Sequence, residues 1–276
     1  MIPSHQAVAR AAWRRGRWEK GTRQIAEETA VALTYNRATH AVMMATPADL
    51  EDFAVGFSLA EGIVARAEEI EEIEIVAVDE GVEARMWIAP ARADALGQRR
   101  RAMAGPTGCG LCGLDSLAQA LRPPPRVRQG VRIAPAEIET AVASLTPAQP
   151  LGRATRAVHA AGFWRPGDGL VALREDVGRH NALDKLAGAL ALAGETAEAG
   201  LLVMTSRVSV ELVQKAARMG ASVLVAVSAP TGLALRVAEQ AGITLAAVAR
   251  EDGFELFTHP ERIEAGTAKD AMHDAA

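Results

Sequence analysis

The sequence predicts an α/β protein with a carboxyl-terminal parallel sheet covered by helices, preceded by a smaller α+β domain. Three continuous apolar runs, at 200–204, 222–227 and 244–248, are separated by amphipathic segments at 209–219 and 231–241, as in a βαβαβ unit. Short alternating segments around one strong helical pattern occupy the part before residue 105. The chain of 276 residues, 49% of them hydrophobic, is long enough to bury two cores.

Composition and charge narrow the class of protein. A net charge of −4 implies no general attraction to nucleic acid. No run of about 18 apolar residues occurs and no apolar segment follows Met1, so we expect neither a membrane span nor secretion, but a cytoplasmic protein. Residues 1–23 carry many basic side chains against Glu19 alone. They are predicted to be a disordered basic arm, with an Arg-rich transit peptide as the alternative, and 267–276 a disordered tail.

The amino-terminal domain is predicted at 24–104. Segments 30–35 and 40–44 flank a polar turn and predict a hairpin. A helix is expected to begin after Thr46, which can cap it, with Pro47 in its first turn, and to run to Gly62. Two further strands, at 73–78 and 84–88, follow an acidic run that we interpret as a solvated face.

Residues 105–126 are predicted to connect the two domains. Four glycines occur within 105–113, which predicts a flexible loop and places Cys109 and Cys112 inside it. A short helix at 114–121 and a stiff connector at the three prolines 123–125 are expected to follow.

The two cysteines are the strongest chemical signal in the chain. A thiol reacts as a thiolate, and here the glycines give access while Arg99, Arg100 and Arg101 lie just upstream. We therefore expect a lowered thiol pKa. Half of a zinc site is the structural alternative, but the chain has no second cysteine pair.

A zinc deaminase would need a His-x-Glu before its cysteines. The only match, at 259–261, follows them. We predict no metal site, and the deaminase reaction is disfavoured.

The second domain is predicted at 127–266. A strand at 170–174 and a helix from about Leu183 to Ala193 are joined by 175–185, EDVGRHNALDK, which is dense in titrating groups. These groups are either caps and surface ion pairs or the polar wall of a cleft, with His180 as acid, base or ligand. His159 is either a half-buried histidine with its hydrogen bonds satisfied or a residue that takes part in function.

Two strand ends lead into hydroxyl-rich turns. Thr205, Ser206 and Arg207 follow one apolar run, and Ser228 follows the next. Helix N-termini at such turns bind phosphate, although ordinary N-capping explains each turn alone. Together they predict an anion or nucleotide site, without a G-x-G-x-x-G or P-loop motif.

Four motifs in this order resemble the FdhD family of formate dehydrogenase accessory sulfurtransferases. They are TPADL at 46–50, GCGLCG at 108–113, EDVGRHNALDK at 175–185 and SAPT at 228–231, and the resemblance runs from about residue 28 to 258. It implies a sulfur carrier that takes persulfide sulfur from a cysteine desulfurase. The sulfur then passes to the molybdenum cofactor, bis-molybdopterin guanine dinucleotide, before that cofactor enters formate dehydrogenase. The resemblance also implies a cytidine-deaminase-like three-layer domain without zinc, and a homodimer.

Residue by residue, Cys109 matches the persulfide-forming cysteine of the family and Cys112 its companion. The cofactor-binding stretch matches Val248, Ala249, Arg250, Glu251, Asp252 and Gly253, which we expect directly after the last strand of the sheet. The hydroxyls of Thr205, Ser206 and Ser228, with Arg207 and His180, are expected to meet the guanine-nucleotide part of the cofactor. A cofactor-binding chaperone that passes no sulfur is the alternative.

Overall fold

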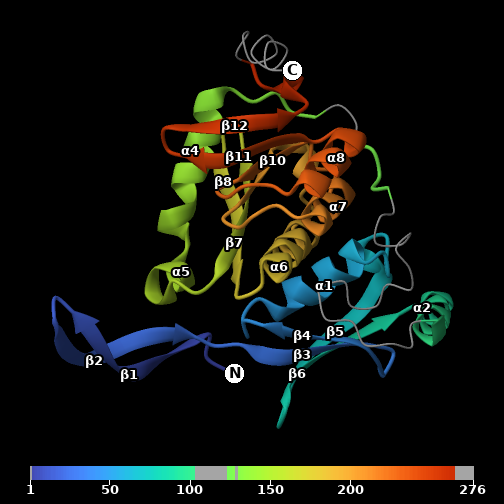
Figure 1. Cartoon of the computed structure of the whole chain (residues 1–276). Helices are drawn as coiled ribbons and strands as arrows, with labels where there is room; N and C mark the ends of the chain where they lie inside the picture. Colours follow the sequence, from blue (N-terminus) through green and yellow to red (C-terminus); the bar gives the residue numbers. More distant parts are fainter. Residues whose placement is uncertain (1, 103–122, 128–129, 265–276) are drawn as a thin grey trace.

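The computed structural model describes residues 2–102, 123–127 and 130–264 (Figure 1). The described residues form two layered domains and a projecting hairpin. The cysteine loop at 105–113, the expected helix at 114–121 and the tail at 267–276 lie outside them. The three prolines at 123–125 lie in a described stretch without regular secondary structure.

The amino-terminal domain is a four-stranded sheet covered by helix α1. The strands are arranged in the order β4-β3-β6-β5, with β3 and β6 parallel and the other pairs antiparallel. The elements are β3 (Thr29–Tyr35), β4 (Ala38–Ala45), α1 (Leu50–Ala60), β5 (Ile70–Val78), β6 (Gly81–Ile88) and α2 (Pro90–Ala102). The predicted hairpin, helix and pair of strands are therefore confirmed.

The two polar residues at the tip of the β3–β4 turn adopt the backbone conformation of a tight hairpin. Asn36 and Arg37 both have positive φ angles, 46° and 68°, as the tightest hairpin turns require. The Asn36 side chain also donates to the Ile88 carbonyl at 2.8 Å and accepts from the Ile88 amide at 2.9 Å, which ties the turn to β6.

The carboxyl-terminal domain has three layers, with a mixed sheet between two layers of helices (Figure 1). The strand order is β12-β11-β10-β9-β7-β8. The strands are β7 (His159–Arg165), β8 (Gly169–Asp176), β9 (Leu201–Met204), β10 (Val223–Ala226), β11 (Thr244–Arg250) and β12 (Gly253–Thr258). The helices are α4 (Pro135–Leu145), α5 (Pro150–Thr155), α6 (Arg179–Leu192), α7 (Val210–Arg218) and α8 (Gly232–Ala241). Short 3-10 turns are η1 (Ala67–Glu69), η2 (Thr146–Ala148), η3 (Ala197–Ala199) and η4 (Pro260–Arg262).

The continuous apolar runs are explained by burial on both faces of this sheet. In β9, Leu201 and Val203 face α4, whereas Leu202 and Met204 face α6, α7 and α8. The predicted βαβαβ unit is confirmed as β9-α7-β10-α8-β11. The sheet is not wholly parallel, however, because β7 and β12 run antiparallel to their neighbours.

The first 23 residues are not the disordered arm predicted above. Strands β1 (His5–Arg14) and β2 (Arg17–Ala26) pair antiparallel along their whole length. The prediction of disorder was based on the many basic side chains. The structure depends instead on the alternation of side chains along the two paired strands.

The two domains meet where α1 crosses α6. Gly56 and Gly188 lie at the crossing, and a Cβ on Gly56 would come within 1.7 Å of the Asp184 carbonyl oxygen. A Cβ on Gly188 would lie 1.9 Å from the Asp52 carbonyl oxygen. Only glycine at these positions allows the helix backbones to approach this closely.

Candidate functional site

One edge of the carboxyl-terminal sheet collects most of the predicted site residues. Because β8, β9, β10 and β11 run in one direction and β7 runs in the opposite one, their carboxyl ends and the start of β7 share this edge. Backbone hydrogen bonds link the turns along it, from Val208 to the Ala229 carbonyl at 3.3 Å and from Val248 to the Ser228 carbonyl at 3.5 Å. The carboxyl-end edge of an α/β sheet is the usual place for a ligand.

His180 belongs to a polar cluster at this edge. It lies in the first turn of α6, and its Nε2 is 3.4 Å from Ser209 Oγ and 3.8 Å from a carboxylate oxygen of Glu211. Interaction with His180, helped by a hydrogen bond from Ser209, lowers the pKa of Glu211 to about 2. The cluster brings α6 and α7 together, and it joins a carboxylate to a group that can carry a proton.

Arg179 adds positive potential to the same edge, beside His159. His159 begins β7 and is half-buried, and its pKa is lowered from 6.5, first by burial and then by the charge of Arg179. The Nε atom of Arg179 is buried and has no hydrogen-bond partner among the described residues. Arg207 is exposed nearby, at the turn after β9. An anion would therefore be favoured here over a cation.

The strand-end hydroxyls make hydrogen bonds to backbone groups. Thr205 Oγ1 accepts from the Ala160 amide at 2.8 Å, and Ser206 Oγ donates to the Arg207 carbonyl at 3.0 Å. Thr231 caps α8 by accepting from the Ala234 amide at 3.3 Å. These hydroxyls thus hold the turns in place, and the free amides of the helix N-termini are the better donors for a phosphate.

The stretch 248–253 lies at the same edge. It was predicted to follow the last strand of the sheet, but one more strand, β12, comes after it. Strand β11 continues to Arg250, and Gly253 starts β12, so the stretch is the bulged turn of a hairpin. Val248 has a φ of 53°, a left-handed conformation that a β-branched residue rarely adopts. Such strain tends to occur at functional sites. Arg250 donates to the carbonyls of Val227 and Ala249, and Glu251 and Asp252 are exposed at the tip.

Much of the 175–185 motif has a structural role that sequence reasoning missed. Asp176 and Lys185 are fully buried and form an ion pair of 2.6 Å. Asp176 also accepts from the Thr46 amide at 3.0 Å, and Lys185 donates to the Thr46 carbonyl at 2.9 Å. Asn181 reaches the Met44 carbonyl at 2.9 Å. These residues lock the amino-terminal domain onto α6, so Thr46 does not cap α1, whose N-cap is Asp49.

Neither alternative for the motif therefore holds alone. Asp176, Asn181 and Lys185 are buried joints between domains, whereas Arg179 and His180 lie at the sheet edge. The two sets are distinguished by the contacts of the buried set with Met44 and Thr46 in the other domain, and no local sequence pattern indicates these contacts.

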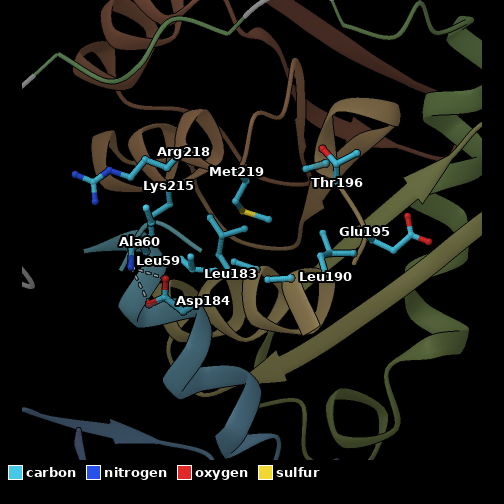
Figure 2. A pocket seen from close by; sticks show the side chains of 14 residues that line it. Leu59, Ala60, Leu183, Asp184, Leu190, Glu195, Thr196, Lys215, Arg218 and Met219 are labelled. Atoms are coloured by element: carbon cyan, nitrogen blue, oxygen red, sulfur yellow. Dashed lines mark hydrogen bonds and ion pairs between the residues drawn. The ribbon is translucent and has the colours of Figure 1, made fainter. Parts of the chain in front are cut away.

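A cavity of about 200 Å³ lies elsewhere, between the end of α1 and the helices α6 and α7 (Figure 2). Leu183, Leu190 and Met219 line it, and the ion pair between Asp184 and Lys215, at 2.6 Å, lies at one side. Burial raises the pKa of Asp184, and Lys215 opposes the shift. The cavity contains none of the predicted site residues and is smaller than the ~300 Å³ at which ligand pockets usually begin.

Cys109 and Cys112 lie outside the described residues, so the structure does not place them relative to the edge. Within 2–102, 123–127 and 130–264, no group of three or more His, Cys, Asp or Glu side chains is arranged to hold a metal ion. None of the helices in these ranges is long and apolar enough to cross a membrane.

Fold and site thus define a two-domain α/β protein with a sheet edge lined by helix N-termini and by the side chains of Arg179 and Arg207. The chain belongs to the FdhD/NarQ family, whose model matches residues 26–264. It is 54% identical over 263 residues to the sulfur carrier protein FdhD of Agrobacterium fabrum, covering 94% of this chain and 96% of that protein. It is 51% identical to the protein of the same name from Cupriavidus necator, over 95% and 91% of the two chains.

A solved structure gives the same relationship. A crystal structure from Desulfotalea psychrophila, described as a candidate formate dehydrogenase accessory protein, superposes with a TM-score of 0.73 at 27% identity. It covers 95% of this chain and 100% of the other. The mixed α/β architecture is therefore shared with this accessory protein.

Proposed function

We propose that this protein is a sulfur carrier that serves formate dehydrogenase, acting as a sulfurtransferase with a persulfide on Cys109. The observation that carries the proposal is the match, over nearly the whole chain, to relatives named as sulfur carriers, together with the GCGLCG motif at 108–113. A cytoplasmic location is part of the proposal.

The transfer follows from thiol chemistry. The Cys109 thiolate attacks the outer sulfur of a persulfide on a cysteine desulfurase, and the desulfurase cysteine leaves as a thiolate. Cys109 then carries the outer sulfur and is regenerated as a thiolate when that sulfur passes, at the sulfane level, to the molybdenum cofactor. The two electrons that would turn it into a sulfide come from the cofactor, which would therefore have to accept it in a reduced state. Cys112 is the companion that can resolve or protect the persulfide.

The sheet edge is the proposed seat of the cofactor, bis-molybdopterin guanine dinucleotide, which is the substrate of the transfer. The N-termini of α6, α7 and α8 end at this edge beside Arg179 and Arg207, which suits the diphosphate of a dinucleotide. The strained turn at 248–253 forms the far end of the edge, and His180 lies in the wall between α6 and α7.

Intact mass after incubation with a cysteine desulfurase and cysteine tests the carrier role. We expect the wild type to gain one sulfur mass that a reductant removes. Cys109→Ser should lose the gain, and Cys112→Ser, the matched control, should keep it. A wild type without any gain, or an unaltered gain in Cys109→Ser, would reject Cys109 as the carrier and leave a cofactor chaperone.

A further inference from the structure

The N-terminus of α7 departs from the usual capping arrangement. Ser209 is the N-cap residue, and a serine at this position usually accepts a hydrogen bond from an amide of the first turn. Here the side chain makes no such bond. Its Oγ lies instead 3.4 Å from His180 Nε2, and a carboxylate oxygen of Glu211 lies 3.8 Å from the same nitrogen. Two side chains of α7 therefore converge on one ring nitrogen of α6.

The neighbours of this nitrogen determine where the ring hydrogen lies. Interaction with His180, and then a hydrogen bond donated by Ser209, lower the pKa of Glu211 to about 2 against the effect of burial, so its carboxylate is ionised and only accepts. Because the one hydrogen of the Ser209 hydroxyl points at Glu211, its oxygen is an acceptor toward His180. With an acceptor on either side, Nε2 carries the hydrogen. Nδ1 makes no hydrogen bond within the described part of the chain and is left for a ligand.

Glu211 is the acidic group that the imidazole ring meets most closely. The other charged groups around His180 are Arg179 and Asp184 on α6 and His159 on β7. Asp184 is already paired with a lysine of α7 at 2.6 Å. Among the described residues, Glu211 supplies the only carboxylate oxygen within 4.0 Å of the ring nitrogens.

A carboxylate in the first turn of a helix also has a simpler explanation. It complements the positive end of the helix dipole wherever it lies, and this role needs no histidine. In that case the negative charge of Glu211 would only repel an anion bound at the sheet edge. Removing the charge would then strengthen the binding of an anion, whereas a carboxylate that acts through His180 would weaken binding when it is removed.

We propose that Glu211 is a positioning residue of the sheet edge, which together with Ser209 holds His180 through Nε2 and so presents Nδ1 to the anionic part of the ligand. This inference rests on the proposed function, which seats a guanine nucleotide at this edge. Glu211 does not touch the ligand. It orients the ring, and it is the counter-charge of the ring when the imidazole is protonated.

The affinity of the full-length protein for guanosine diphosphate, measured by isothermal titration calorimetry, tests the sign of the effect. Glu211→Ala should weaken binding about tenfold, near the lower end of what a hydrogen bond to a charged group contributes. His180→Gln should weaken binding as much. Adding Glu211→Ala to His180→Gln should weaken it no further, because Glu211 acts through His180.

Glu198→Ala is the matched control. Glu198 is exposed in the first turn of η3, which precedes β9 and so lies at the opposite edge of the sheet. This variant should bind guanosine diphosphate like the wild type.

Proton–nitrogen NMR of the His180 ring tests the positioning without a ligand. At mildly alkaline pH, the ring hydrogen of the wild type should be on Nε2. In Glu211→Ala both tautomers should be populated, while the circular dichroism spectrum stays the same. A carboxylate that only complements the helix dipole would leave the tautomer unaltered.

The outcomes separate this inference from the proposed function. Stronger binding in Glu211→Ala, an equal loss with and without His180, or a ring hydrogen that stays on Nε2 in Glu211→Ala would each overturn the positioning role and leave the nucleotide seat intact. A wild type that does not bind guanosine diphosphate would reject the seat itself, and with it the role of Glu211 in binding.

Discussion

Replacing Lys185 by methionine tests whether the buried ion pair holds the two domains together. Methionine keeps most of the volume of the lysine side chain but removes its charge. Asp176, with which Lys185 pairs at 2.6 Å, would then be a fully buried carboxylate without a cation. The Thr46 carbonyl would lose its donor as well.

The magnitude follows from what remains around Asp176. Breaking a buried pair by removing one partner costs about 3–5 kcal/mol, because the other charge stays uncompensated. Asp176 keeps three hydrogen-bond donors, namely the Thr46 and Gly178 amides and the Asn181 side chain. We therefore expect a loss near the lower end, about 3 kcal/mol.

Urea unfolding followed by circular dichroism measures the loss as a shift in the midpoint at constant slope. The double variant Asp176→Asn/Lys185→Met should be more stable than Lys185→Met alone, because it buries no charge. Arg165→Met, which removes partly exposed pairs with Glu195 at 2.7 Å and with Asp168 at 2.5 Å, is the control and should cost at most about 1 kcal/mol. A Lys185→Met protein within about 1 kcal/mol of the wild type would refute the reasoning.

Two further variants probe the joint and the sheet edge. Gly56→Ala should destabilise by several kcal/mol, because its Cβ meets backbone at 1.7 Å, whereas Gly97→Ala, with nothing within 4 Å, should be neutral or stabilising in the same urea experiment. Arg179→Gln should raise the pKa of His159 toward 6.5 without reaching it, because burial still lowers it, and a proton NMR titration measures this. Since the folded pKa lies below the unfolded value, the contribution of His159 to stability is fully present above pH 6.5, and it is lost as pH falls from 6.5 through the lower folded pKa. An unchanged pKa in Arg179→Gln would contradict the assigned proximity.

The elements that could be predicted are those in which the pattern of apolar residues fits only one type of secondary structure. The apolar runs of β9, β10 and β11 and the amphipathic helices between them were found because burial on both faces leaves no polar alternation. Strand β7, with the sequence HAAGFWR, was missed because its alanines and glycine carry little preference for a strand. Helix α4 had a usable signal in Ile138, Ala141, Val142 and Leu145, at helical spacing behind Pro135.

The β1–β2 hairpin was missed for a different reason. Its sequence, HQAVARAAWR followed by RWEKGTRQIA, alternates on β1 with arginines on one face, and Arg15 and Gly16 form the turn. The density of arginines suggested a solvated tail, although cross-strand pairing and not net charge decides whether such a segment folds.

The candidate site could be predicted only in part, because the 175–185 motif both joins the two domains and contributes residues to the sheet edge. Asp176 contacts Thr46, which is 130 positions away in the sequence, and this contact fixes where α6 begins. Arg179 and His180 occupy the first turn of that helix, so their positions depend on the buried pair that flanks them. A substitution at Lys185 would therefore impair the sheet edge without touching a ligand. A substitution in the motif that abolishes activity therefore does not by itself place the residue in the site. It does so only when the free energy of unfolding of the variant is the same as that of the wild type.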